Sequence, residues 1–530
     1  MKHLRENFPT WVFALVALLH FSYLRLDIPE VDAAQLAEIS RELMLSSNWW
    51  ELKFLGEPYL DKPHLLFWLS ALSMKIFGVG DWSYRFPSFL FGWLGVYSVY
   101  RFALLYYHKQ VARTAALIAA SFFYAYIATY DVRADTVLAG SVMFACWNLA
   151  AFIAQNSAYR AVLSGLGLAL AFSAKGPIGL VAPMFVFLPA FFSLNLYRRK
   201  LLFRIPLLLL FFALGSFPVL YAHYKQFGWE GLRFFLWKQS FGRVTGESGW
   251  SNNPDPFFVI HTTAWALLPY TAYVTTGLFK GIISFVKGAG REQYSLCGLV
   301  FTLGALSLSK YQLPHYFYVA YPLAAVVAAP SFFYDSGNQR WINIINISLN
   351  GAFLIISLVM VMYIFPQTLM VKLFCISCAV ISIYLLLSKF PFKWSLILHF
   401  ILLQGILSCC FFPELLNYQS NSAIGKHLKG AGVKQNQYTV YNNWRVYSLS
   451  YVSQTIPYIT NVDEQLALRC SQKPHYVICF EEDIQKIEKI CGQPSEKLLF
   501  LHYPITQLSL SFLLPHSRPA VVKKAAIVKY

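Results

Sequence analysis

Apolar runs long enough to cross a bilayer recur along this chain, and they constrain its fold more than any other feature. About thirteen runs reach the roughly 17–25 residues that a transmembrane helix needs. Their approximate centres are Leu18, Leu94, Ala120, Phe144, Leu168, Phe185, Leu210, Leu268, Leu303, Ala324, Leu354, Ile381 and Leu402. Hydrophobic residues make up 57% of the 530 residues, and charged residues only 13%. A soluble chain of this length cannot bury so much apolar surface, so the sequence predicts an all-α polytopic membrane domain.

Basic residues fall in every second loop between these runs, which predicts the topology. The inner loops hold Lys2 and Arg5, Lys109 and Arg113, Arg160, Arg198 to Arg204, Lys280 to Arg291, Arg340, and Lys389 and Lys393. This alternation follows the positive-inside rule with the N-terminus inside, and an odd number of helices then places the C-terminus outside. The net charge of +18 is therefore assigned to topology and to anionic membrane lipid, with no nucleic-acid partner expected.

The composition changes after about Pro413, and we expect a boundary there between a membrane domain (1–412) and a C-terminal domain (413–530). Short alternating runs at Tyr438–Tyr441 and Tyr476–Phe480 resemble strands, and Glu481–Ile490 resembles a helix. About 110 residues are a feasible size for an independent domain. The sequence therefore predicts a small extracytoplasmic α/β domain. Its three cysteines, Cys470, Cys479 and Cys491, allow one disulfide without specifying the pair.

The outer loops are rich in charged residues of both signs. The first of them, residues 27–86, is unusually long and holds Asp32, Glu38, Asp61, Lys62 and Arg85. Later outer loops hold Asp131, Arg133 and Asp135; Lys175; Lys238, Arg243, Glu247 and Asp255; and Lys310, His315 and Tyr316. Charged groups at membrane depth are costly and usually face a cavity or one another. The pattern predicts one polar cavity at the outer membrane surface, assembled from many loops.

Six motifs in this order resemble the bacterial GT-C glycosyltransferases that use lipid-phosphate sugars. They are the Asp-led AEISREL helix, PYLDKPHLLFW followed by FGVGDWSYRFPS, RADTVLAG, SAKGPIGLVAP, the GRVTGE loop and SLSKYQLPHYFYVAYP. The group includes the aminoarabinose transferases acting on lipid A and relatives of the protein O-mannosyltransferases. The resemblance covers about residues 10 to 335. It implies a GT-C fold with thirteen helices and an outer C-terminal domain.

The resemblance also implies an activity, which is transfer of a sugar from a polyprenyl-phosphate donor. The acceptor is a lipid A-type glycolipid, a protein or a cell-surface glycan, at the periplasmic face of a bacterial inner membrane. Fixed cations stabilise the leaving phosphate, and a carboxylate orients or deprotonates the acceptor. The candidate catalytic residues are Asp32 and Asp135. The candidate substrate-binding residues are Tyr59, Lys62, Arg133, Lys175, Arg243, Lys310, His315 and Tyr316, and Asp61 is a candidate metal ligand.

Simpler structural roles stand beside these functional ones. Asp32 with Gln35 fits a helix capping box. Lys62 before Pro63 fits a lysine that reaches the membrane interface ahead of a helix that starts with proline. Arg133 and Asp135 are close enough in sequence to pair with each other at a helix end, and His315 fits an interfacial histidine.

Two departures from the family pattern bear on chemistry. Ala33 and Gln35 stand where the family usually has Glu and Arg, and the stretch Trp237–Arg243 lacks the histidines that some members have there. A divalent metal would thus depend on Asp61 alone, and no other cofactor is expected.

Two other functional classes remain open at this stage. The number of helices also fits a transporter or flippase for a lipid-linked glycan, although no internal repeat of the helix pattern is visible and the outer loops are long. The loop charges would alternatively serve a catalytically silent scaffold by holding helices together.

Overall fold

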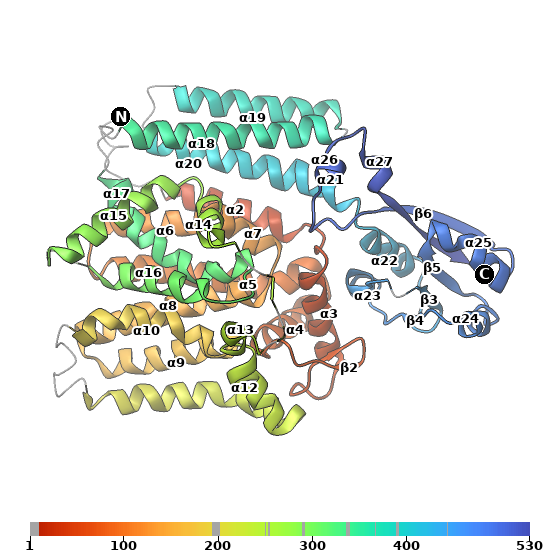
Figure 1. The fold of residues 1–530 in the computed structure, drawn as a ribbon, viewed down its shortest axis with the longest axis horizontal. Helices are drawn as coiled ribbons and strands as arrows, with labels where there is room; N and C mark the ends of the chain where they lie inside the picture. The colour runs from red at the N-terminus through yellow and green to blue at the C-terminus, as the bar shows by residue number, and fades with distance from the viewer. Residues whose placement is uncertain are drawn as a thin grey trace.

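The computed structural model describes residues 10–192, 202–247, 249, 251–252, 255–288, 292–334, 340–365, 367–387, 392–442 and 444–530. Long helices form a bundle, and a smaller part with a β-sheet lies at one end of it (Figure 1). The bundle helices are α2 (Trp11–Leu24), α5 (Asp81–Ala103), α6 (Lys109–Ser121), α7 (Phe123–Tyr130), α8 (Ala134–Gln155), α9 (Ala158–Lys175), α10 (Ile178–Phe192), α12 (Ile205–Arg233), α15 (Thr271–Val286), α16 (Tyr294–Ser307), α17 (Tyr321–Phe333), α18 (Arg340–Val359), α19 (Leu369–Leu387) and α20 (Phe392–Ile406).

Within the described residues, five helical segments are long and apolar enough to cross a membrane: Ala134–Gln155, Ile205–Lys238, Pro314–Phe333, Trp341–Ile364 and Lys393–Leu416. The bent pair of α6 and α7 makes a sixth. Shorter apolar helices are α2, α4 (Leu65–Phe77), Ile178–Pro189, α15, α16 and Leu369–Leu385. The prediction of a mostly helical membrane fold is confirmed, whereas the count of thirteen spans is not.

Two of the expected spans are interrupted, which explains part of the difference in count, and two others meet at a glycine turn. The helix through Ala120 bends by 48° between α6 and α7. The run centred on Leu268 is two helices, because α14 (Phe258–Ala266) ends before Pro269 and α15 begins after it. Helix α9 ends at Lys175, where Gly176 adopts a φ of 69° that favours glycine.

The polar stretch after α2 forms a compact layer at one end of the bundle. It contains α3 (Asp32–Leu45), the two-stranded hairpin of β1 (Lys53–Phe54) and β2 (Glu57–Pro58), and α4. Figure 1 shows α3 between the bundle and the C-terminal elements. Helix α5 begins at Asp81, inside the expected first loop, and the loop boundary at residue 86 stays a prediction.

Arg85 therefore belongs to the bundle and does not line a polar cavity. Its side chain is fully buried in α5 and donates hydrogen bonds to the carbonyl oxygens of Leu24, Leu26, Asp27 and Tyr130. These bonds satisfy carbonyl groups at the ends of α2 and α7 that have no partner within their own helices. Arg85 thus ties the bundle together beneath the polar layer.

The rest of the chain adds connecting helices and a mixed sheet. The connecting elements are η2 (Phe234–Lys238), α13 (Gly242–Thr245), η3 (Pro314–Ala320), η4 (Met360–Ile364), η5 (Leu407–Phe411) and α21 (Phe412–Leu416). After them come α22 (Ser420–Gly430), β3 (Tyr438–Tyr441), α23 (Tyr447–Ser453), β4 (Tyr458–Thr460), α24 (Asp463–Cys470), β5 (Tyr476–Phe480), η6 (Glu481–Asp483), α25 (Ile484–Cys491), β6 (Glu496–His502), α26 (Leu510–Leu513), α27 (Arg518–Val521) and β7 (Lys523–Lys529).

The five-stranded sheet has the order β4-β3-β5-β7-β6. Strand β3 is parallel to β4 and β5, and β7 is antiparallel to β5 and β6. The strands β3 and β5 coincide with the two runs identified in the sequence, and the expected helix is a 3₁₀ turn followed by α25. The domain boundary at residue 413 stays a prediction.

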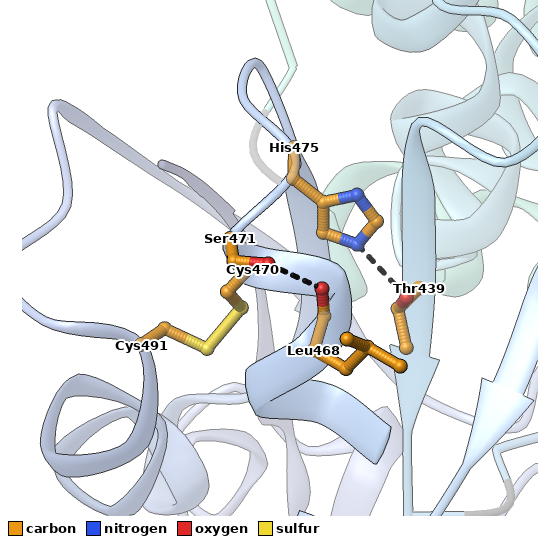
Figure 2. Close-up of a disulfide and its surroundings, with 6 residues drawn as sticks. All are labelled: Thr439, Leu468, Cys470, Ser471, His475 and Cys491. Atoms are coloured by element: carbon orange, nitrogen blue, oxygen red, sulfur yellow. Dashed lines mark hydrogen bonds between the residues drawn. A yellow bond between two sulfur atoms is a disulfide. The ribbon is translucent and has the colours of Figure 1, made fainter. Parts of the chain in front are cut away.

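One disulfide joins two helices beside this sheet. Cys470 at the end of α24 is bonded to Cys491 at the end of α25, and Cys479 in β5 is a buried free thiol. Figure 2 shows the disulfide next to Ser471, with His475 bonded to Thr439 nearby. The pair that the sequence left open is thus Cys470 with Cys491.

Candidate functional site

A polar cavity of about 120 Å³ lies where α3, the turn after β2, the start of α8, the end of α9 and η3 come together. Its lining consists of Asp32, Gln35, Leu36, Tyr59, Asp61, Lys62, Arg133, Ala134, Asp135, Lys175, Tyr311, Leu313, His315 and Tyr316. Nine of these residues are candidates from the sequence. They come from the four loops that the sequence analysis assigned to the outer side, and these loops meet at one cavity.

Asp32 and Arg133 join the loop that follows α2 to the loop that precedes α8. Asp32 is the first residue of α3, and its carboxylate accepts a hydrogen bond from the guanidinium of Arg133. Arg133 precedes α8 and also bonds Asp131 at 2.9 Å. Burial opposes the charged form of Arg133, but the two carboxylates outweigh it and hold its pKa above the ordinary value.

The helix-capping role considered for Asp32 is wrong. The N-cap position of α3 is Val31, and no side chain caps the helix. Arg133 and Asp135 do not pair with each other either, because each binds a residue from another loop. The Asp32 side chain is 52% exposed and lies at the cavity wall. It is therefore open to an incoming molecule.

Asp135 and Lys175 form the buried floor of the cavity. The Lys175 Nζ lies 2.5 Å from Asp135 Oδ1, and the two side chains are only 5% and 8% exposed. Lys175 Nζ also lies 4.3 Å from the ring centroid of Tyr316, within the range of a cation–π contact. His315 Nε2 lies 3.9 Å from the other Asp135 oxygen. The ammonium group of Lys175 and the carboxylate of Asp135 are thus fixed side by side at the floor of the cavity.

Lys62 and Tyr59 complete the cavity from the turn that follows β2. Lys62 Nζ lies 2.6 Å from Asp61 Oδ2, and both side chains are partly exposed. Burial, with a smaller contribution from Asp61 and Asp32, raises the pKa of Tyr59 well above its usual value, so its hydroxyl stays a neutral donor. Gln239, from the segment after η2, donates a hydrogen bond to the Asp61 carbonyl oxygen and holds this turn in place.

A second, apolar pocket of about 340 Å³ adjoins the polar cavity. The two share Asp135, Lys175 and Tyr316, and the remaining lining is Leu138, Pro177, Ile178, Val181, Trp237, Ser240, Phe241, Thr245, Ala305, Leu306, Leu308 and Ser309. It lies among α8, α10, α13 and α16. A charged cavity and an apolar pocket thus lie side by side and share three lining residues, an arrangement that suits an amphiphilic molecule.

One sequence candidate with a described side chain, Lys310, does not line the polar cavity, and another, Arg243, cannot be placed relative to it. The exposed Lys310 donates to the carbonyl oxygen of Thr245, which belongs to the apolar pocket. Arg243 lies in the short helix α13, and its side chain is outside the described part of the structure. The roles of both residues stay predictions.

Sequence reasoning missed several residues of the lining. Gln35 lies one turn after Asp32 on the same face of α3, so its place follows from the helical period. Tyr311 and Leu313 belong to the SKYQLPHY segment that supplied His315 and Tyr316, but nothing in their residue types marked them. Among the described residues, no group of three or more His, Cys, Asp or Glu side chains is arranged to hold a metal ion. Asp61 as a metal ligand stays a prediction.

The chain is similar in sequence and in fold to known membrane transferases. Residues 61–221 match the family of dolichyl-phosphate-mannose-protein mannosyltransferases. An undecaprenyl phosphate-alpha-4-amino-4-deoxy-L-arabinose arabinosyl transferase of Proteus mirabilis is 29% identical over 295 residues, which cover 54% of this chain and 52% of that protein. An uncharacterized protein of Aquifex aeolicus is 31% identical over 311 residues, covering 58% of this chain and 67% of that protein.

Solved structures extend the comparison to the whole chain. The crystal structure of ArnT from Cupriavidus metallidurans bound to undecaprenyl phosphate superposes with a TM-score of 0.75 at 14% identity, covering 98% of this chain and 97% of that chain. The chain belongs to the GT-C family of lipid-phosphate-sugar glycosyltransferases. In sequence, the match spans about half the length of the first arabinosyl transferase relatives, at 52% and 57%.

Proposed function

We propose that this GT-C protein is an integral membrane glycosyltransferase that moves a sugar from a polyprenyl-phosphate donor to an acceptor. The observation that carries this proposal is that the charged cavity and the apolar pocket adjoin and share Asp135, Lys175 and Tyr316. A polyprenyl-phosphate sugar has the same division, with a charged phosphate between an apolar chain and a sugar. Relatives from Proteus mirabilis and Pectobacterium carotovorum are undecaprenyl phosphate-alpha-4-amino-4-deoxy-L-arabinose arabinosyl transferases, which supports the same donor class.

Lysines on two sides of the cavity suit the leaving phosphate. Lys62 and Lys175 are each paired with a carboxylate in this structure, at 2.6 and 2.5 Å. A phosphate gains charge as the bond to the sugar breaks, and fixed cations aimed at that charge lower the barrier. Lys62 is the more exposed of the two and is the first contact we assign to the phosphate. Lys175 lies where the polar cavity meets the apolar pocket, beside the expected path of the lipid chain.

Asp32 suits the acceptor side of the reaction. In the proposed step, the acceptor oxygen attacks the anomeric carbon, the bond from that carbon to the phosphate oxygen breaks, and polyprenyl phosphate leaves. A hydroxyl acceptor loses its proton to Asp32, whereas an ionised phosphate acceptor needs only to be positioned. Arg133 donates a hydrogen bond to the Asp32 carboxylate, and both residues line the cavity. Asp135 is less available for this role because Lys175 neutralises it.

The side of the membrane follows from charge and cysteine chemistry. Basic residues concentrate in loops on the face that we assign to the cytoplasm, such as Lys109 and Arg113. The Cys470–Cys491 disulfide belongs to an oxidising compartment, as expected for the periplasmic side. We therefore place the cavity and the C-terminal part at the periplasmic face of a bacterial inner membrane.

Transfer measured with purified protein tests the proposed function. The protein in detergent or nanodiscs would receive a radiolabelled polyprenyl-phosphate sugar and, in separate reactions, a lipid A-type glycolipid or a hydroxyl-bearing glycan. We expect label in one acceptor and release of polyprenyl phosphate in equal amounts. If label stays on the donor with every acceptor while labelled donor crosses the bilayer of proteoliposomes, the protein is a flippase and the proposal is wrong.

A further inference from the structure

The segment that leads into α3 is hydrogen-bonded to the C-terminal part of the chain, which comprises residues 417–530 after α21. One oxygen of Glu30, Oε1, accepts three hydrogen bonds: from the Ser448 backbone N–H at 2.9 Å, the Ser448 hydroxyl at 2.6 Å and the Asn421 amide at 2.8 Å. Burial raises the pKa of the Glu30 carboxyl, and these neutral donors partly offset that effect. Three donors from α22 and α23 thus converge on one carboxylate.

The backbone around Glu30 is fixed by the same part of the chain. Gln419 accepts a hydrogen bond from the Glu30 N–H at 2.8 Å and donates one to the Ile28 carbonyl oxygen at 2.9 Å. Asp27 is bonded to Lys426 of α22 at 2.7 Å. The chain is therefore held from Asp27 to Glu30, just before the first turn of α3.

The C-terminal part also forms hydrogen bonds with α3 itself. Glu38 is fully buried and accepts a hydrogen bond from the Ser450 hydroxyl at 2.6 Å, as well as two from Arg41. Arg41 in turn donates to the carbonyl oxygen of Gln454 at 3.1 Å. Helix α3 packs along α23, so the C-terminal part contacts α3 over several turns (Figure 1).

The C-terminal part does not itself reach the polar cavity. No lining residue of that cavity lies beyond Tyr316 in the described chain. Asp32, however, follows Glu30 by only two residues, and two residues span at most about 7 Å. A displacement of Glu30 would therefore also displace the Asp32 carboxylate, which binds Arg133.

We propose that the C-terminal part is a positioning element for Asp32 and that Glu30 is the residue through which it acts. This inference rests on the proposed glycosyl transfer, in which Asp32 faces the acceptor. Glu30 is a positioning residue, because it lines no part of the polar cavity and touches none of the reacting groups. Misplacement of a reacting group by about 1 Å can lower a rate about 10²-fold.

Two substitutions at Glu30 separate positioning from simple support of the fold. Glu30→Ala removes the acceptor for all three donors, and we expect kcat to fall about 10- to 10²-fold while KM for the donor stays unchanged. Glu30→Gln keeps an oxygen that accepts from Ser448 and Asn421, so we expect it to restore most of the lost kcat. Because Ser448→Ala acts on the same contact, the double variant with Glu30→Ala should be no slower than Glu30→Ala alone.

A matched control uses a carboxylate on the same side of the molecule. Glu482 makes an exposed pair with Lys523 at 3.1 Å beside the sheet, far along the chain from α3. We expect Glu482→Ala to keep wild-type kcat. Equal kcat in Glu30→Ala, Glu482→Ala and the wild type would overturn the proposal, as would a Glu30→Gln variant no faster than Glu30→Ala.

Amide hydrogen exchange supplies a readout that does not depend on activity. In Glu30→Ala we expect faster exchange in the first turn of α3, residues 32–36, with little change in α8. Unchanged exchange in this turn would overturn the positioning role even if the enzyme transfers sugar. A wild-type protein that transfers no sugar would instead refute the proposed function, and the exchange comparison would still decide whether Glu30 fixes α3.

Discussion

Replacing Asp32 with asparagine distinguishes a role of this carboxylate in catalysis from a role in protein stability. The substitution keeps the size of the side chain but removes its charge, so it weakens the pair with Arg133. Asp32 is 52% exposed, and exposed pairs contribute only about 0.2–1 kcal/mol. The lost charge at the start of α3 costs about 0.3–1 kcal/mol more through the helix dipole. The free energy of unfolding should therefore fall by about 2 kcal/mol at most.

The expected effect on transfer is larger. A general base contributes about 10²–10⁴-fold to a rate, which corresponds to about 3–5 kcal/mol in the barrier. We therefore expect Asp32→Asn to lose at least about 10²-fold in kcat with a hydroxyl acceptor. The loss should be much smaller with an ionised phosphate acceptor. Initial rates of radiolabel transfer and a thermal denaturation curve on the same preparation measure both quantities.

Asp131→Asn is the matched control for this experiment. Asp131 binds the same arginine at 2.9 Å but does not line the cavity. This variant removes an equivalent ion pair while leaving the Asp32 carboxylate in place, so its loss of transfer should be far smaller. The reasoning is refuted if Asp32→Asn keeps near-normal transfer with hydroxyl acceptors, or loses no more than Asp131→Asn.

Three further predictions concern the phosphate, the lipid chain and the topology. Lys62→Ala should weaken transition-state binding by about 2–5 kcal/mol, and Lys62→Arg should recover part of that loss. The control Lys53→Ala, which changes an exposed lysine in β1, should transfer sugar at the normal rate. Equal transfer rates in both alanine variants would exclude Lys62 from the site. Ala305→Trp fills the apolar pocket, so KM should rise for long-chain donors but not for short-chain analogues. The control Val300→Trp, on the exposed face of α16, should leave both KM values unchanged. A rise in KM that does not depend on chain length would contradict the assignment of this pocket to the lipid chain. In a Cys409→Ser background, an impermeant thiol reagent should label Lys434→Cys but not Lys109→Cys in intact cells, and the reverse pattern would invert the topology.

Much of the site was predictable because its residues stand at helix ends, where charge is easily recognised against apolar spans. Asp32, Lys62, Arg133, Asp135, Lys175 and Tyr316 all line one cavity, as the outer-loop pattern indicated. Their pairings were not predictable from local sequence. Arg133 binds Asp32, which is 101 positions away, and not its neighbour Asp135, whose own partner Lys175 is 40 positions away. Such choices depend on how α3, α8 and α9 pack.

Helix boundaries were predicted less well than helix positions, for physical reasons that particular residues show. Arg85 is charged and was therefore assigned to a polar loop, yet it is buried in α5, where backbone carbonyl groups supply its partners. The apolar run around Leu268 has the composition of a span, but Pro269 interrupts its hydrogen bonds. Composition measures hydrophobicity along the chain and does not register these tertiary and backbone effects.

A structure of the purified protein with undecaprenyl phosphate, determined by electron cryo-microscopy in nanodiscs, tests the central claim most directly. We predict phosphate density in the polar cavity, with the ammonium group of Lys62 or Lys175 about 2.7–2.9 Å from a phosphate oxygen. The first isoprene units should lie in the apolar pocket beside Ile178, Phe241 and Leu308. Phosphate density bound at the basic loops on the opposite face, with the polar cavity containing only water, would contradict the account.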